Sequence, residues 1–127
     1  MTIAYWCVLA AILLPYVWTL TAKLSSGFRP RDNHVPREYL DRLPVGPAKR
    51  AHWAQLNTFE STPGFMAAVI VAHQAGAAQA TIDALALAFI GLRLAYGFFY
   101  VADQAMLRSL VWMAGLGCIV ALFFAAA

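Results

Sequence analysis

The sequence has little charge. Only 12% of its 127 residues are charged, whereas 62% are hydrophobic. A soluble domain of this length needs more charged side chains to cover its surface. The composition therefore excludes an ordinary soluble globular domain and predicts an integral membrane protein in a lipid bilayer.

Outside one segment, basic residues are scarce. Seven of the nine Lys and Arg residues fall within residues 23–50, so the pI near 9.1 reflects one basic loop. The sequence does not interleave aromatic and basic residues in the way that nucleic-acid-binding proteins do. A nucleic-acid partner is not expected.

Cysteine is also scarce. Cys7 and Cys118 both lie in apolar runs, and there is no Cys-x-x-Cys or Cys/His spacing. This pattern argues against a disulfide framework and against a metal site, and it predicts that both cysteines pack as small apolar residues. No Ser-His-Asp pattern is present either, so any nucleophile is expected to arrive with a ligand.

The chain does contain four apolar stretches, at about residues 2–22, 48–73, 82–102 and 108–126. A helix of roughly 20 residues is about 30 Å long, which matches the hydrocarbon core of a bilayer. The pattern predicts an all-α membrane protein, a single four-helix bundle over residues 1–127. Pro15 is tolerated in a membrane helix, because neighbours can satisfy the carbonyl that it frees, and Thr81 is a candidate N-cap for the third helix.

The loop at residues 23–47 sets the predicted orientation. Lys and Arg concentrate in cytoplasmic loops, so this loop is predicted to be cytoplasmic and both termini to lie on the opposite side. The segment PREYLDRL predicts one short helix within the loop. His52 and His73 are expected near opposite membrane interfaces, and the four tryptophans are expected to act mostly as interfacial anchors: Trp6, Trp18, Trp53 and Trp112.

Three of the predicted helices carry polar side chains where a membrane makes them unfavourable, and such residues are candidates for function. Helical spacing places them in one stripe on the second predicted helix and one on the third, and a cluster lies at the cytosolic mouth of the fourth: Arg50, Asn57 and Glu60; Arg93, Tyr96, Tyr100 and Gln104; Arg108, Ser109 and Trp112. Guanidinium groups bind carboxylates through two parallel hydrogen bonds. The stripes therefore predict a cytosol-facing cavity in which a small polyanion meets a lipophilic molecule.

Structural roles are also open for these residues. Asn57 is a candidate for a hydrogen bond between helices. Glu60 and Arg93 are expected to form a buried ion pair that fixes helix packing, in preference to a direct catalytic role.

Three motifs resemble those of one family: RAHWAQLNTFESTPGF at residues 50–65, RLAYGFFY at residues 93–100 and LRSLVW at residues 107–112. They are similar to the R-x6-N-x2-E motif followed by Pro, the R-x2-[HY]-x3-Y motif and the Arg-Ser pair of the MAPEG family, membrane-associated proteins in eicosanoid and glutathione metabolism. The chain resembles a short bacterial member, which implies the bacterial inner membrane. The resemblance also implies a homotrimer with glutathione bound between subunits near the cytosolic face.

The resemblance further implies a glutathione-dependent transferase or peroxidase acting on lipophilic electrophiles or lipid hydroperoxides. Its implied glutathione-binding residues are Arg50, Asn57, Glu60, Arg93, Tyr96 and Tyr100. Arg108 would lie near the glutathione sulfur, where a cation lowers the pKa of a thiol, and Ser109 would donate a supporting hydrogen bond.

Two alternative functions remain open. Trp53 stands where many enzymes of the family have an arginine, which favours a non-catalytic accessory or structural membrane protein with the same fold. The third hypothesis is a small proton-coupled exporter that uses Glu60.

Overall fold

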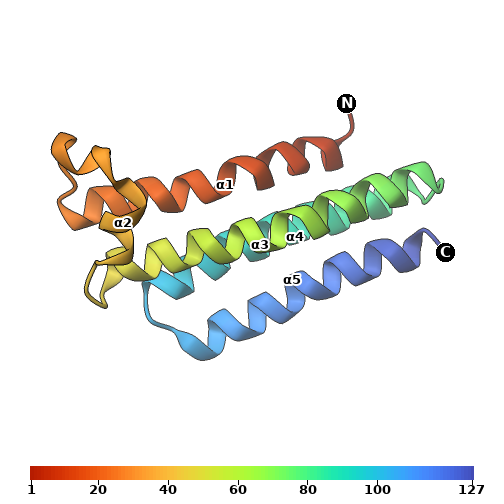
Figure 1. Ribbon diagram of the computed structural model, residues 1–127. Coiled ribbons are helices and arrows are strands. Elements are labelled where there is room, and N and C mark those ends of the chain that lie inside the picture. The colour runs from red at the N-terminus through yellow and green to blue at the C-terminus, as the bar shows by residue number, and fades with distance from the viewer.

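The computed structural model describes residues 1–127 and is 84% helical with no strand, which confirms the all-α class. Four long helices lie side by side (Figure 1): α1 (Ile3–Ser26), α3 (Pro47–Gln74), α4 (Gln79–Val101) and α5 (Ala105–Ala125). A 3-10 helix, η1 (Pro30–His34), and a short helix, α2 (Pro36–Asp41), lie in the connection between α1 and α3. This connection sits at one end of the molecule and both termini sit at the other.

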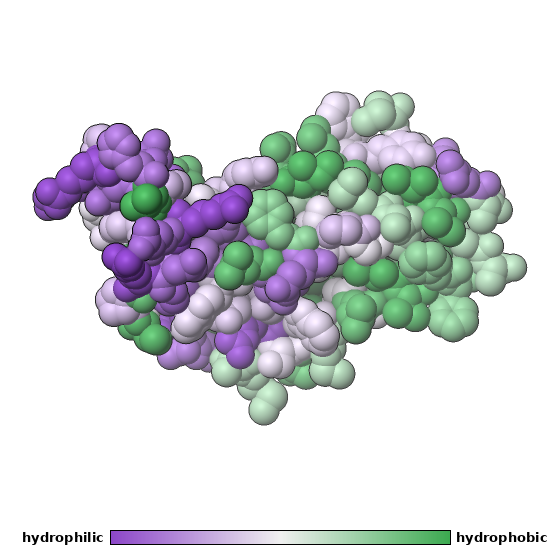
Figure 2. Space-filling view, in the orientation of Figure 1, coloured by the Kyte–Doolittle hydropathy of each residue, from purple (hydrophilic) through white to green (hydrophobic).

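Hydrophilic residues gather at the end that carries η1 and α2, whereas the body of the molecule is largely hydrophobic (Figure 2). Helices α1, α4 and α5 are long and apolar enough to cross a membrane. Helix α3 is the longest, at 28 residues, but it does not reach the same apolar character. Its first half carries charged and polar side chains, including Arg50 and Glu60.

Two expected helix ends are corrected by the structure. Helix α1 continues past residue 22 to Ser26, because a lysine at position 23 does not interrupt a helix. It ends at Gly27, whose φ of 72° is favourable for glycine, and the N–H of Phe28 donates to the Lys23 carbonyl at 3.3 Å. Thr81 is not an N-cap, because α4 already begins at Gln79 and Thr81 lies in its first turn.

The carbonyl that Pro15 frees in α1 meets a side chain of α3, which agrees with the expectation that a neighbour can satisfy it. Pro15 has no N–H, so the carbonyl of Ala11, four residues earlier, loses its partner within the helix. The hydroxyl of Thr62 lies 3.3 Å from that carbonyl oxygen and 2.8 Å from the carbonyl oxygen of Thr58. The one proton of the Thr62 hydroxyl is therefore shared between a carbonyl of α1 and a carbonyl of α3.

Trp18 is buried and is not an interfacial anchor. It is 9% exposed and packs directly on Gly97 of α4, where a Cβ atom would lie only 2.0 Å from the Trp18 ring. The absence of a side chain at Gly97 lets the indole lie against the backbone of α4. The identity of Trp18 as a core residue thus depends on a glycine 79 positions later, which the local sequence around Trp18 does not reveal.

The main hydrophobic core lies toward the end that carries the termini. Phe65 of α3 and Phe89 of α4 stack there with ring centroids 4.1 Å apart and nearly parallel planes. Cys7 and Cys118 are free and buried in the same cluster, which confirms their predicted role as small apolar residues. The polar side chains of α3 and α4 lie beyond this core, closer to α2.

Candidate functional site

Two adjoining hollows open between α3, α4 and the start of α5, and together they form what we call the polar recess. Their volumes are about 400 and 370 Å³. Asn57, Tyr96 and Tyr100 line both hollows. The remaining lining residues are Trp53, Leu56, Glu60, Arg108, Ser109, Trp112 and Met113.

Arg93 is buried behind the polar recess and contacts the residues that line one side of it. Its side chain is 2% exposed, and Nη2 donates to Asn57 Oδ1 at 3.0 Å and to Thr58 Oγ1 at 3.2 Å. The guanidinium also lies 4.3 Å from the centre of the Tyr96 ring, where a cation is attracted to the ring face. Arg93 therefore fixes the positions of Asn57 and Tyr96 relative to each other.

The predicted ion pair between Glu60 and Arg93 is wrong, because Asn57 stands between the two charges. Asn57 accepts from Arg93 through Oδ1 and donates through Nδ2 to Glu60 Oε2 at 3.2 Å. No direct contact between the two charged groups falls within ion-pair distance. Glu60 is exposed in the single chain, so its carboxylate remains available at the mouth of the recess.

Thr58 belongs to the site and was not predicted. It is buried, accepts from Arg93, and donates to the Ala54 carbonyl at 2.7 Å. Because it follows Asn57 directly, helical geometry turns it by about 100° from the polar stripe. A search for residues on one face of the helix therefore passes over it.

Aromatic rings connect the three helices across the polar recess. The Arg108 guanidinium of α5 lies 4.4 Å from the centre of the Tyr100 ring. Tyr100 packs edge-on against Tyr96 at 5.5 Å and lies 6.3 Å from Trp53 of α3. Tyr100 thus places Arg108 beside the polar residues of α3 and α4.

Ser109 lines the same recess, but its hydroxyl proton is used within α5. The Oγ atom donates to the carbonyl of Ala105 at 3.0 Å, the usual bond of a serine to the preceding helical turn. To donate to a ligand the hydroxyl must rotate away from this carbonyl.

Arg50 is not brought into the polar recess of the single chain. Its Nε donates to the Val101 carbonyl at 3.1 Å, and its Nη1 lies 3.8 Å from the Asp103 carboxylate. Arg50 therefore ties the start of α3 to the end of α4. Asp103 follows α4 with a φ of 60°, so this contact also lies at a tight turn of the backbone.

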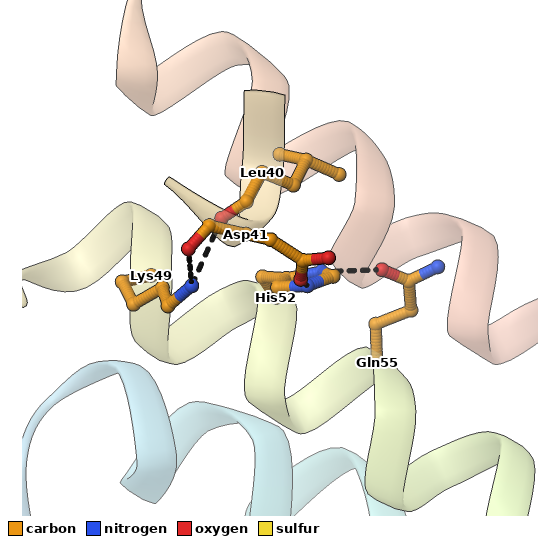
Figure 3. Close-up of polar contacts among 5 residues, drawn as sticks. All are labelled: Leu40, Asp41, Lys49, His52 and Gln55. Carbon is orange, nitrogen blue, oxygen red and sulfur yellow. Dashed lines mark hydrogen bonds and ion pairs between the residues drawn. The ribbon is translucent and has the colours of Figure 1, made fainter. Parts of the chain in front are cut away.

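A second polar cluster fastens the α1–α3 connection to α3 (Figure 3). Lys49 Nζ donates to the carbonyls of Leu40 and Asp41, which close the end of α2. His52 lies between Asp41 and Gln55, with ring nitrogens 2.9 Å from Asp41 Oδ1 and 3.1 Å from Gln55 Oε1. We call these residues the α2 clasp. Because Lys49 is buried in this cluster, its ammonium group does not extend into the polar recess.

The fold and the recess define an all-helical membrane protein with an open polar recess between three of its long helices. The chain belongs to the MAPEG family, whose family model matches residues 3–127. None of the curated proteins compared with the chain matches it. The family is associated with glutathione and includes glutathione-dependent transferases and peroxidases as well as non-catalytic members.

Proposed function

We propose that this protein is a glutathione-dependent membrane transferase or peroxidase acting on lipophilic electrophiles or lipid hydroperoxides. The observation that carries the proposal is the position of Arg108. Its guanidinium lies on the Tyr100 ring at the edge of a recess that Asn57 and Tyr96 also line. A cation is therefore presented beside several hydrogen-bonding groups at the end of α5 nearest to the basic loop.

The recess offers chemical groups that match those of glutathione. Glutathione has two carboxylates, an ammonium group, two amides and a thiol. Arg108 would receive negative charge, the Glu60 carboxylate would receive the ammonium group, and Asn57 and the two tyrosines would bind the peptide groups. The proposed glutathione-binding set is Arg50, Asn57, Glu60, Arg93, Tyr96 and Tyr100. Within it, Arg93 acts by holding Asn57, and Arg50 acts by holding the end of α4.

Arg108 and Ser109 are the proposed catalytic residues. A cation about 4 Å from a thiolate contributes roughly 4 kcal/mol at an effective dielectric constant of about 20. This is enough to lower the pKa of the thiol by about three, which raises the fraction of thiolate at neutral pH. Ser109, once rotated away from the Ala105 carbonyl, would donate a hydrogen bond to the same sulfur.

The proposal includes a homotrimer of single four-span domains in the bacterial inner membrane. Glu60 lies near the middle of α3 and is exposed in the single chain. A carboxylate in contact with lipid at this depth is unfavourable, so neighbouring copies would cover this face of α3. The basic loop at residues 23–47 would face the cytoplasm, and the termini would lie on the other side because they occupy the opposite end of the molecule.

The test is conjugation of glutathione to an aromatic electrophile by the purified protein in lipid nanodiscs. Arg108→Ala is expected to lower turnover about 100-fold while the Kd for glutathione changes less than fivefold, because stabilisation of the thiolate contributes mainly to the reactive state. Arg42→Ala is the matched control, since Arg42 is an exposed arginine of the loop paired with Glu38. Unchanged turnover in Arg108→Ala would remove Arg108 from the mechanism. Absence of conjugate with the unsubstituted protein, together with no glutathione-dependent reduction of a lipid hydroperoxide, would refute the activity.

A non-catalytic accessory protein is the second candidate, and Trp53 favours it. Trp53 lines the recess at the position of a family arginine, and neither Arg50 nor Lys49 extends into the recess in its place. This candidate predicts that glutathione leaves the unfolding temperature unchanged while the trimer persists. A glutathione-dependent rise in that temperature would count against it.

A further inference from the structure

A separate hollow lies in the connection between α1 and α3, at the hydrophilic end of the molecule (Figure 2), and we call it the loop hollow. Its volume is about 330 Å³. Its four charged lining residues and two of its apolar ones come from η1, α2 and the residue between them: Arg31, Asp32, Glu38, Arg42, Val35 and Tyr39. The loop hollow shares no residue with the polar recess, so it is a distinct site.

The loop hollow lies at the depth of the lipid headgroups. Helices α1 and α4 have 24 and 23 residues, so each is about 35 Å long, whereas the hydrocarbon core of a bilayer is about 30 Å thick. Their ends therefore reach the headgroup layer. Leu40 of α2 packs with Ala22, in the last turns of α1, and the lining residues Tyr39 and Leu43 pack against the same cluster.

Contacts on two sides hold the loop hollow in shape. The Tyr39 hydroxyl donates to the Ser26 carbonyl at 3.0 Å, and the Tyr39 ring packs edge-on against Phe28 with centroids 5.0 Å apart. Lys49 of the α2 clasp donates to the carbonyls at the end of α2. The site is therefore formed before a ligand arrives, and binding does not have to order the loop.

The charges of the loop hollow are balanced, with two arginines beside two carboxylates. Arg42 pairs with Glu38 one helical turn earlier, and Arg31 Nε lies 3.9 Å from Asp32 Oδ1, beyond hydrogen-bond distance. The side chains of Arg31 and Arg42 are 75% and 79% exposed, and ion pairs between exposed side chains contribute little to stability. A ligand that carries both charges can therefore replace these contacts at small cost.

The two carboxylates keep oxygen atoms that can accept hydrogen bonds from a ligand. Asp32 Oδ2 accepts from the Arg29 N–H at 2.8 Å, which orients the group, whereas Oδ1 accepts no hydrogen bond from the protein. Glu38 contacts Arg42 through Oε1 alone. A primary ammonium group has three N–H donors, so it can bond to both carboxylates. A quaternary ammonium group has the same charge and no N–H.

We propose that the loop hollow binds the headgroup of a phospholipid that carries a primary ammonium group, as phosphatidylethanolamine does. The phosphate lies against Arg31 and Arg42, because guanidinium groups form strong charge-assisted hydrogen bonds with phosphate. The ammonium group lies against Asp32 and Glu38, and Val35 gives apolar contact to the methylene groups between the two charges. The lipid site is independent of the proposed activity, since it lies outside the polar recess.

A series of headgroups tests the proposal. The full-length protein in detergent micelles is titrated with phospholipids that have identical acyl chains, and native mass spectrometry measures the fraction of protein that holds one lipid. The Kd is expected to rise in steps from phosphatidylethanolamine through its N-methyl and N,N-dimethyl derivatives to phosphatidylcholine, by about tenfold in total, as N–H donors are lost. Equal affinity for the first and last members of the series would refute the role of the ammonium group.

Phosphatidylglycerol tests the charge balance, because its headgroup has the phosphate without the ammonium group. It is expected to bind about tenfold more weakly than phosphatidylethanolamine. Binding that is tighter than that of phosphatidylethanolamine would overturn the proposal, because the net positive charge of the loop would then govern lipid binding.

Substitutions test the location. Glu38→Gln keeps the size of the side chain, removes its charge, and should reduce the preference for phosphatidylethanolamine over phosphatidylcholine about fivefold. Asp103→Asn is the matched control, since Asp103 is an exposed acid outside the loop hollow. Arg31→Gln should weaken binding of both lipids, because both carry the phosphate, whereas Arg37→Gln, at an exposed arginine outside the hollow, should not. An unchanged preference in Glu38→Gln, or an equal loss in Asp103→Asn, would refute the site.

Soluble phosphoethanolamine separates the lipid from a free compound with the same charged groups. It is expected to leave the bound lipid in place at millimolar concentration, because it lacks the acyl chains that hold the headgroup at the depth of the loop hollow. Displacement at a concentration equal to that of the lipid would show that the site takes the soluble compound, and the assignment to a lipid would be wrong.

Discussion

Replacement of Gly97 by alanine tests the contact between α1 and α4. The new Cβ atom would lie 2.0, 2.2 and 2.6 Å from three carbon atoms of the Trp18 ring. All three belong to the six-membered ring of the indole, which is buried and cannot swing into open space. The two helices must therefore separate, or Trp18 must leave its rotamer.

The size of the effect follows from these distances. The shortest contact must lengthen from 2.0 Å to about 3.4 Å before it becomes an ordinary one. Overpacking of a well-ordered core costs typically about 1–3 kcal/mol, and three simultaneous contacts place Gly97→Ala near 3 kcal/mol. A gain in helix propensity of about 1 kcal/mol from Gly to Ala offsets part of this, which leaves a net loss of about 2 kcal/mol.

The free energy of unfolding is measured by titrating a denaturing detergent into micelles that contain the protein. Gly91→Ala is the matched control, because Gly91 also lies in α4 and nothing is within 4 Å of its Cβ position. Trp18→Phe removes the ring atoms that collide, so the cost of Gly97→Ala should fall by about 3 kcal/mol in that background, which leaves only the gain in helix propensity of about 1 kcal/mol. Equal stability of the two alanine variants, or additive effects of Gly97→Ala and Trp18→Phe, would refute this account of the contact.

Three further predictions concern other contacts. Thr62→Val should lower the free energy of unfolding by about 1–2 kcal/mol, because it removes the donor to the α1 carbonyl, while Thr21→Val, at an exposed hydroxyl that bonds within its own helix, should change it little. Asp103→Val should lower the same quantity by about 1–2 kcal/mol, because a branched residue is strained at a φ of 60°, whereas the glycine variant at that position should retain full stability. Asp41→Asn should weaken the bond to His52 and increase protease cleavage within residues 41–47; a cleavage rate equal to that of the unsubstituted protein would show that the α2 clasp does not restrain the loop.

Local sequence patterns predict the helices well and their partners poorly. Hydrophobic length locates α1, α4 and α5, the predicted stretch at residues 48–73 corresponds to the less apolar α3, and the proline-rich segment predicts the α2 region. Helix ends are less accurate where a charge was used as the signal: Lys23 lies inside α1, and the glycine at position 27 ends the helix instead. Charge marks where a helix leaves lipid, whereas backbone conformation marks where it stops.

Local sequence also predicts the side-chain contacts of the polar site only in part. Helical spacing places Asn57, Tyr96 and Tyr100 on faces that meet, and the structure brings these residues together. Spacing also suggests that opposite charges pair directly, but Asn57 lies between Arg93 and Glu60. Distances between helices decide which of two polar groups bonds to an arginine. The sequence of one helix does not contain these distances.

The hydroxyl of Thr62, which lies between α1 and α3, restricts how the two helices can be aligned. Two apolar helix faces can slide or rotate against each other with little change in buried area. Hydrophobic contact therefore brings the helices together more strongly than it fixes their relative rotation and height. The carbonyl freed by Pro15 has a direction, and Thr62 meets it at one rotation and one height only. Moving the proline by one residue would turn the freed carbonyl by about 100° around α1 while leaving its hydrophobicity unchanged. A replacement for α1 that matches only its apolar character would therefore lose this directional contact with α3.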